Sequence, residues 1–372
     1  MAKLLICIDW YTPGYKAGGP IQSVQNLVEV LKDQFEIFIL TGDRDAGEPE
    51  PYALPTATWI QQGAAKVMYL SPDQRSQGQI RQLIKQIQPE VIYLNSMFSF
   101  PFTVYPIRGR GNAQVILAPR GMLHAGALRI KKAKKRVFLR AFKLAGLHRS
   151  IQWHATDDQE VLDIQAHFGD QASITQAGNI PKRVQKPWSV TPKESGDLRL
   201  FFNSRVSEKK NLLFAIQSLQ SVQGRVQFDV FGPHEDAEYL ALCQSAAKEL
   251  PSGIIVSFHG PKPPMKLMEG IETAHFGYLP THGENFGHSI FESFLAGKPV
   301  LISDQTPWRN LETQQLGWDL PLDDPNAFTQ TLQTLVDMDA TTYQIWSRNA
   351  WRFAKAYNED PALISQTNAI FA

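Results

Sequence analysis

The sequence predicts an α/β protein made of two doubly wound domains that face each other across a cleft. Short apolar runs of the kind that form buried strands alternate with amphipathic helical patterns. The alternation stops in the polar residues 182–197, which contain two prolines, and then starts again. A chain of 372 residues is also long for a single core. We therefore expect one domain over residues 1–181 and a second from residue 182 to residue 350.

The first domain contains the strand-like runs at residues 4–8, 37–40, 67–70, 91–94 and 115–118. Each run is continuously apolar, as is typical of parallel strands covered on both faces. Pro20 stands where a periodic helix begins, a first-turn position that proline favours. Further helices are predicted at residues 80–87 and 159–168, and Asp157 is a suitable N-cap for the latter. Strands and helices thus alternate through this half of the chain.

The second domain repeats the pattern, with strand-like runs at residues 198–202, 227–231, 254–258 and 276–279. A periodic helix begins near Ile290, and two more cover residues 327–338 and 343–357. Ligands of open α/β sheets bind beyond the carboxyl ends of the strands. The loops that follow these strands are therefore the expected binding loops.

The composition indicates a globular protein without membrane-spanning helices. The chain is 43% hydrophobic and 20% charged, which is typical of an ordinary soluble globular protein. Cys7 and Cys243 lie far apart in apolar surroundings and are expected to be reduced, in the cytoplasm. The N-terminus lacks the pattern of a signal peptide, and no run reaches the ~20 apolar residues of a membrane-spanning helix.

Glycines and acids mark two loops of the first domain. Gly18 and Gly19 precede the first helix, where a ligand can approach the backbone closely, although the loop is not G-x-G-x-x-G. Asp43 and Asp45 form a D-x-D pattern, which holds a divalent metal in some enzymes. Because this pattern lies in a polar loop rich in Glu and Pro, we expect a solvated loop and no metal site.

A basic segment follows without counter-charges. Residues 91–156 contain no Asp or Glu, while residues 129–149 concentrate Lys and Arg. At helical spacing two stripes separate, one apolar and one basic. The apolar stripe consists of Ile130, Ala133, Val137, Ala141 and Leu144, and the basic one of Arg129, Lys132, Arg136, Arg140 and Lys143. An anionic membrane surface or a lipid-diphosphate acceptor fits this helix, whereas no nucleic-acid motif is present.

The stretch at residues 282–300 combines a loop with a helix. An apolar strand leads into it and a Gly-Lys-Pro sequence ends it. The helix start offers unpaired N–H groups at Phe286, Gly287 and His288, which could hold an anion such as a diphosphate. Glu284 and Glu292, eight residues apart, would be separated by roughly 12 Å. That distance excludes a glycosidase pair and suits two ends of one long ligand.

Residues 284–292 read ENFGHSIFE, and residues 296–300 read AGKPV. The stretch resembles the E-x7-E motif of retaining glycosyltransferases of family 4, which have the GT-B fold, and residues 302–308 resemble a branch that builds bacterial surface polysaccharides. The resemblance implies a nucleoside-diphosphate sugar as donor substrate. It places Glu284 on donor-sugar hydroxyls and Glu292 on the ribose, with Asn285 and the Phe286-Gly287-His288 backbone beside the phosphates.

Other positions carry the same resemblance. Residues 203–211, NSRVSEKKN, match the segment in which Arg205 and Lys210 would grip the leaving diphosphate without a metal. Gly18 and Gly19 would lie near the donor phosphates and the acceptor, and residues 259–264 against the nucleobase. The family's final helix crosses back, so residues 351–372 should pack on the first domain. The side chains expected to hold it there are Trp346, Trp351, Phe353 and Tyr357.

One position departs from the family pattern. Arg120 stands where related proteins often carry a histidine near the transferred sugar. Either His124 supplies the imidazole from four residues on, or Arg120 stabilises developing negative charge. Both residues remain candidates.

The resulting expectation is a retaining, metal-independent transfer of a sugar to an acceptor hydroxyl, in O-antigen, capsule or exopolysaccharide biosynthesis. The acceptor, a saccharide or a lipid-linked saccharide, would enter from the side carrying residues 129–143. The protein would be cytoplasmic and peripheral on the inner face of the cell membrane. The alternatives are a GT-B sugar-nucleotide epimerase or phosphorylase, and a catalytically silent nucleotide-binding protein.

Overall fold

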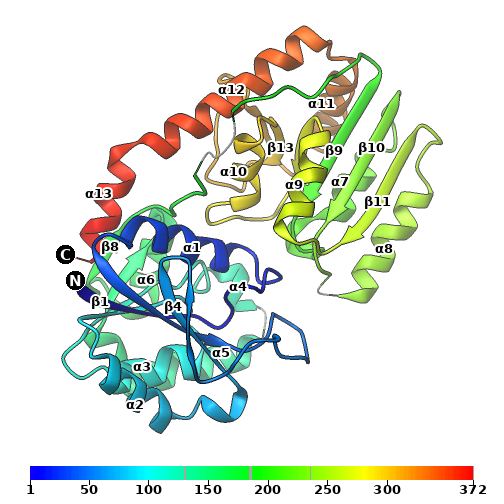
Figure 1. The fold of residues 1–372 in the computed structure, drawn as a ribbon. Coiled ribbons are helices and arrows are strands. Elements are labelled where there is room, and N and C mark those ends of the chain that lie inside the picture. Colours follow the sequence, from blue (N-terminus) through cyan, green and yellow to red (C-terminus); the bar gives the residue numbers. More distant parts are fainter. Residues whose placement is uncertain (130, 184–186, 235, 372) are drawn as a thin grey trace. The chain divides into compact units, whose positions relative to one another are not determined.

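The computed structural model describes residues 1–129, 131–183, 187–234 and 236–371 (Figure 1). The chain forms two compact units. The first unit comprises Met1–Ile180 together with Asp360–Ala372, and the second comprises Pro181–Glu359.

An eight-stranded sheet forms the centre of the first unit, in the order β3-β4-β2-β1-β5-β6-β7-β8. Neighbouring strands are parallel except β3 and β4. The strands are β1 (Ala2–Cys7), β2 (Phe35–Gly42), β3 (Trp59–Gln62), β4 (Ala65–Leu70), β5 (Val91–Leu94), β6 (Gln114–Leu117), β7 (Gln152–Ala155) and β8 (Ile174–Gln176). Residues 4–7 of β1 are completely buried because β1 lies inside the sheet with apolar clusters on both faces.

Helices cover both faces of this sheet. They are α1 (Gly19–Leu31), α2 (Gln77–Ile87), α3 (Tyr105–Gly109), α4 (Ala125–Arg129), α5 (Lys132–Leu144), α6 (Asp158–Phe168) and α13 (Pro361–Ile370). Ser76 and Gln79 form a capping box at the start of α2, and Asp157 caps α6 by accepting a hydrogen bond from the Glu160 N–H group. These caps satisfy backbone donors that the helices leave unpaired.

The second unit has a six-stranded parallel sheet in the order β11-β10-β9-β12-β13-β14. Its strands are β9 (Asp197–Asn203), β10 (Arg225–Phe231), β11 (Ile254–Gly260), β12 (Phe276–Leu279), β13 (Val300–Ser303) and β14 (Gly317–Leu320). Its helices are α7 (Leu212–Gln217), α8 (Ala237–Lys248), α9 (Pro264–Thr273), α10 (His288–Leu295), α11 (Pro325–Asp337) and α12 (Ala340–Glu359). The strand order reverses direction at β9 and β12, and ligands of such sheets bind at this kind of position.

The end of the chain differs from the prediction in one respect. Trp346, Phe353 and Tyr357 were expected to fasten the last helix to the first domain, but they lie on α12 and pack on the core of the second unit. A separate helix, α13, returns to the first unit, and Ile370 and Phe371 join its core. Figure 1 shows α13 beside the start of the chain, where Gln34 donates a hydrogen bond to Asn368. Phe353 and Tyr357 pack in the second unit because their rings contact those of Phe291, Phe294 and Trp308.

The two cysteines are unpaired and buried, as expected. Burial raises the pKa of the Cys243 thiol to about 11 and raises that of Cys7 as well. Over the part of the chain that the structure describes, no helix is long and apolar enough to cross a membrane.

Candidate functional site

The loops that follow β9, β12 and β13 meet at the carboxyl edge of the second sheet. The backbone carbonyl of Lys209 accepts hydrogen bonds from the N–H group of His282, at 2.8 Å, and from the Thr281 hydroxyl, at 3.2 Å. The N–H group of Glu284 donates to the carbonyl of Gln305 at 3.1 Å. Three segments far apart in sequence are therefore joined around Glu284.

Lys210 and Glu284 form an ion pair within this junction. Their side chains are only 11% and 12% exposed. The prediction assigned Lys210 to the leaving diphosphate and Glu284 to the donor sugar, and the structure brings the two groups into direct contact. A pair so shielded from water holds both side chains in place and balances the carboxylate charge.

Glu292 lies on α10 with its carboxylate turned toward the end of β9. It is 7% exposed and accepts a hydrogen bond of 3.2 Å from the amide of Asn203. Sequence reasoning assigned no role to Asn203, although its position directly after the strand-like residues 198–202 marks it as a strand-end residue. The two acids of the E-x7-E pattern thus have separate partners, Lys210 for one and Asn203 for the other.

The start of α10 depends on Gly287. Its φ of 77° is left-handed, and a Cβ atom there would approach the Ile290 side chain to 2.8 Å. Among hydrogen bonds between described residues, none is donated by the backbone N–H group of Phe286 or Gly287. These donors, next to the positive end of the helix, suit an anion. The side chain of Phe286 takes no part, because it is buried against Phe291 and Trp308.

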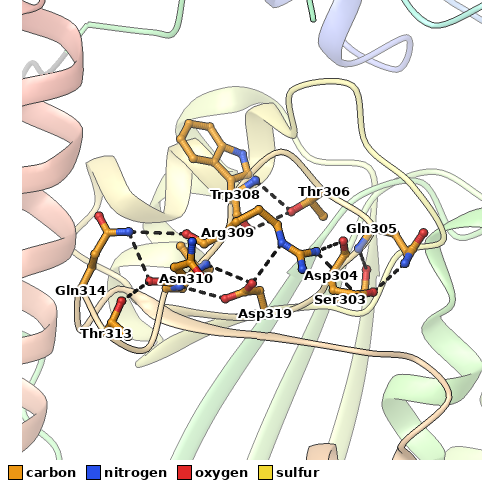
Figure 2. A network of polar contacts seen from close by, with 11 residues as sticks. Ser303, Asp304, Gln305, Thr306, Trp308, Arg309, Asn310, Thr313, Gln314 and Asp319 are labelled. Atoms are coloured by element: carbon orange, nitrogen blue, oxygen red, sulfur yellow. Dashed lines mark hydrogen bonds and ion pairs between the residues drawn. The ribbon is translucent and has the colours of Figure 1, made fainter. Parts of the chain in front are cut away.

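The loop after β13 supports the site through a polar network (Figure 2). Asp319 accepts hydrogen bonds from the N–H groups of Asn310 and Leu311, at 3.1 and 2.8 Å, and lies 3.4 Å from the Arg309 guanidinium. Trp308 donates its indole N–H to the carbonyl of Phe286. The network therefore fixes the backbone next to the first turn of α10.

Arg205 follows β9 and is exposed. Its neighbours are anchored to the next strand end, since the N–H groups of Ser204 and Val206 donate to the carbonyls of Phe231 and Pro233 at 3.1 and 2.8 Å. Gly232 permits this approach, because a Cβ atom there would lie 2.0 Å from the Ser204 carbonyl oxygen. Arg205 is thus carried by a well-held loop at the same sheet edge as Lys210.

In the first unit, Arg120 takes a left-handed backbone conformation with φ of 54°. Its guanidinium donates to the side-chain oxygens of Asn95, Asn179 and Tyr93, at 2.8 Å for Asn95 and 2.7 Å for Tyr93. All three acceptors are neutral, and no carboxylate pairs with Arg120 among the described residues. The positive charge therefore lies at the strand ends without a counter-ion, which suits the role of stabilising negative charge.

The network continues into the core through His154. Its Nδ1 atom lies 2.8 Å from the Tyr93 hydroxyl, and its Nε2 atom 2.9 Å from the Ala177 carbonyl. Both contacts are satisfied when Nε2 carries the proton and Nδ1 accepts from Tyr93. Burial, followed by the charge of Arg120, lowers the pKa of His154 to about 3, so the ring is neutral.

His124 has different surroundings from Arg120. It is exposed, and its Nδ1 atom accepts a hydrogen bond of 3.3 Å from the Gly126 N–H group.

Gly18, with φ of 66°, is the N-cap of α1, and nothing lies within 4 Å of where its Cβ atom would be. A ligand could therefore approach the backbone at Gly18 and Gly19.

The prediction of a solvated D-x-D loop is wrong. Asp43 and Asp45 are 3% and 6% exposed. Asp43 pairs with Arg44 and Arg75. Asp45 accepts hydrogen bonds from the N–H groups of Tyr15 and Lys16 at 2.9 and 3.1 Å. Asp45 therefore holds the glycine-rich loop in shape. The described residues contain no cluster of three or more His, Cys, Asp or Glu that could hold a metal ion.

The basic segment forms α4 and α5, and the predicted apolar stripe faces away from the core. Val137 and Leu144 are 65% and 89% exposed, while Leu139 and Phe142 are the buried residues of α5. Ile130, the first member of the stripe, lies outside the described residues. The helix therefore presents both an apolar and a basic face outward.

The chain is similar to known proteins in sequence over most of its second unit and in fold over its whole length. Residues 197–338 match the family model of group 1 glycosyl transferases. No curated protein sequence matches the chain. Among solved structures, sucrose-phosphate synthase from Thermosynechococcus elongatus is similar with a TM-score of 0.75 at 14% identity, covering 100% of this chain and 98% of that one.

Two further structures share the fold. HepE from Anabaena, solved with UDP and glucose, has a TM-score of 0.71 at 14% identity, with 99% of this chain and 98% of that chain covered. WaaG, a glycosyltransferase involved in lipopolysaccharide biosynthesis, has a TM-score of 0.66 at 14% identity, with 98% of each chain covered. The fold is therefore GT-B. The match to group 1 glycosyl transferases covers most of the second unit.

Proposed function

We propose that this protein is a glycosyltransferase of family 4, which moves a sugar from a nucleoside-diphosphate sugar to an acceptor hydroxyl with retention of anomeric configuration. The bond from the anomeric carbon to the diphosphate oxygen breaks, and a bond from the acceptor oxygen forms on the same face. The hydroxyl proton leaves with the diphosphate. The pathway proposed is the synthesis of a bacterial surface polysaccharide, since the structurally similar WaaG is involved in lipopolysaccharide biosynthesis.

The shielded Lys210–Glu284 pair beside the start of α10 carries the proposal. Three groups lie on loops that contact one another: a carboxylate suited to sugar hydroxyls, a lysine suited to a phosphate, and the N–H groups of Phe286 and Gly287, which donate to no described residue. In this arrangement the diphosphate would draw Lys210 and the α10 N–H groups, and Glu284 would accept hydrogen bonds from the donor sugar. Arg205 would add a second cation, and Glu292 would hold the ribose.

The proposed reaction uses no metal ion. Arg205 and Lys210 would neutralise the leaving diphosphate, a task that a bound Mg²⁺ performs in other enzymes. The engagement of Asp43 and Asp45 by arginines and backbone N–H groups supports this view, because their oxygens are already occupied. Activity is therefore expected to survive excess EDTA. Complete loss that Mg²⁺ or Mn²⁺ restores would contradict the proposal.

A peripheral position on an anionic membrane surface, on the cytoplasmic side, is also proposed. It is supported by the exposed apolar side chains Val137 and Leu144, which lie beside the basic residues of α5. An interfacial helix combines these two features. Anionic lipid attracts each Lys or Arg near its surface by about 1 kcal/mol.

The test begins with a thermal-shift screen over UDP, GDP, ADP and their sugars, because a ligand that binds the native state raises its stability. The donor that binds is then incubated with and without saccharide acceptors, and NMR of the product reads the anomeric configuration. Retained configuration in a transfer product is the expected result. Isomerisation of the donor alone would assign an epimerase, and tight binding without turnover would assign a silent nucleotide-binding protein.

A further inference from the structure

The basic side chains of α5 line a hollow on the first unit. The hollow has a volume of about 420 Å³ and is bounded by residues of α4, α5 and α6. Most of its lining is cationic, from Arg129, Lys132, Lys135, Arg136, Arg140 and Lys143. His167 of α6 adds an imidazole, and Leu128 and Leu139 supply apolar surface. A volume of this size is within the usual range of small-ligand pockets.

The cations of the hollow lack counter-charges. No carboxylate contributes to the lining. Within the described part of the chain, the side chains of Lys132, Arg136 and Arg140 make no hydrogen bond or ion pair with another residue. They stand at four-residue spacing on one helix face, where like charges repel each other. A structural role would have been served better by alternating signs, so the arrangement favours an anionic ligand.

Two further lysines are held in place at the hollow. Lys135 donates a hydrogen bond of 2.7 Å to the Ala127 carbonyl and lies 5.2 Å from the ring centroid of Phe98. Lys143 lies 5.5 Å from the ring centroid of Phe168. These contacts limit the side-chain freedom that a ligand would otherwise have to restrict.

After burial, the positive charge around the hollow is the second cause that lowers the pKa of neighbouring basic groups. Burial first, and then the charge of Lys131, lowers the pKa of Lys135. At His148, burial followed by Arg149 and Lys143 lowers the imidazole pKa. A multiply charged anion would relieve this repulsion, since guanidinium groups match phosphate oxygens in pairs of hydrogen bonds.

We propose that this hollow is a binding site for a phosphate or diphosphate group. On the condition that the proposed function is right, the ligand is the phosphate-bearing part of the acceptor. The hollow would then bind one phosphate or diphosphate group at a defined position, whereas an anionic surface would attract α5 as a whole.

Isothermal titration with inorganic pyrophosphate tests the site on the full-length chain. The variant K132Q/R136Q/R140Q removes three lining cations. The matched control K85Q/K134Q/R149Q removes the same charge from exposed positions of the first unit that do not line the hollow. We expect saturable binding that the lining variant weakens at least tenfold and the control changes less than twofold. Absence of saturable binding, or equal weakening by both variants, would overturn the proposal.

A second arm identifies the source of the phosphate. Farnesyl diphosphate replaces pyrophosphate in the same titration. Tighter binding of farnesyl diphosphate than of pyrophosphate supports a lipid-borne group, and equal binding supports a soluble phosphorylated group at the same site. UDP, GDP and ADP are titrated in parallel. If none of them binds to the wild type or to either variant, the proposed function is contradicted, whereas the pyrophosphate result stands by itself.

Discussion

The two units place charge at their candidate sites in opposite ways. At the strand ends of the second unit, Lys210 pairs with Glu284, and Glu292 accepts a hydrogen bond from Asn203. On α5 of the first unit, Lys132, Arg136 and Arg140 have no partner among the described residues, and their helix has no acid in its first turn. The first arrangement is nearly closed to water, while the second is exposed.

This difference indicates how each site would meet an anion. In the second unit a ligand has to share or exchange an internal partner, so position and hydrogen bonding decide what binds. On α5 the protein keeps the repulsion of like charges until a ligand supplies the counter-charge. Substitutions that remove a cation should therefore have opposite effects on stability at the two places.

The largest effect is expected from Lys210→Ala. Losing a charged contact to a partly buried anion costs about 1.5 to 3 kcal/mol. Turnover should therefore fall by roughly one to two orders of magnitude. The free energy of unfolding should also fall, by roughly 3 kcal/mol, because Glu284 keeps its charge without a partner. Steady-state kinetics and urea denaturation measure both. Lys266→Ala, at an exposed pair on α9, is the control.

The double variant Lys210→Met/Glu284→Gln separates the two effects. It removes both charges and so should regain most of the lost stability while remaining inactive. If the single variant keeps wild-type turnover, Lys210 does not serve the reaction. If the double variant stays as unstable as the single one, the ion pair is not the cause of the loss.

Acid should destabilise both units through buried neutral histidines. Burial lowers the pKa of His154 to about 3 and that of His275 to about 4, from the ordinary 6.5. Below pH 6.5 the unfolded chain takes up protons that the folded chain does not. Each histidine therefore contributes its full stability above pH 6.5 and loses about 1.4 kcal/mol per pH unit as the pH falls toward its folded pKa. Urea denaturation at pH 7, 6 and 5 measures the slope.

The variant His154→Gln isolates this contribution, because a glutamine does not titrate. Its stability should depend less steeply on pH than that of the wild type between pH 6.5 and 5. Parallel curves for the two proteins would show that His154 is not neutral in the folded state.

The exposed apolar stripe should contribute to membrane binding separately from the hollow. Val137→Ser with Leu144→Ser removes two large apolar side chains from α5 and should lower sedimentation with phosphatidylglycerol vesicles roughly tenfold. Pyrophosphate binding should remain unchanged. Leu242→Ser, a 58% exposed leucine on α8 of the second unit, is the control. If the wild-type protein ignores such vesicles at low salt, the peripheral location is wrong.

The smallest expected effect is the opposite of that at Lys210. Arg136→Gln removes one charge from a row of like charges, so the free energy of unfolding should rise by about 0.2 to 0.5 kcal/mol per repulsive pair relieved. Thermal unfolding at low salt, averaged over replicates, detects the change. A clear loss of stability would mean that Arg136 has a structural partner.

The sequence predicted those features that depend on local pattern. Residues 4–8 are apolar throughout because β1 is buried on both faces, and residues 198–202 are apolar except for the exposed Arg199. The expected strands β1 and β9 lie there. Asp157 was recognised as an N-cap because capping needs only the next few residues. The start of α10 at Gly287 followed from its glycine and the periodicity after it.

Features that depend on distant partners could not be predicted in the same way. Asp45 lies in a polar loop, yet it is buried because Tyr15 and Lys16, about thirty residues away, bind its carboxylate. On α5 two faces carry apolar residues at helical spacing. Phe138 and Phe142 form the inward face because their rings contact Phe98 and Phe168. The pairing of Lys210 with Glu284 likewise joins loops that follow different strands.

Titration of nucleoside diphosphates is the most direct test of the account. UDP, GDP and ADP are titrated into the wild type and into Lys210→Met/Glu284→Gln, whose fold is verified by circular dichroism. We predict that the wild type binds at least one of the three and that the double variant raises the Kd of that nucleotide at least tenfold. An unchanged Kd would contradict the assignment of Lys210 to the donor diphosphate.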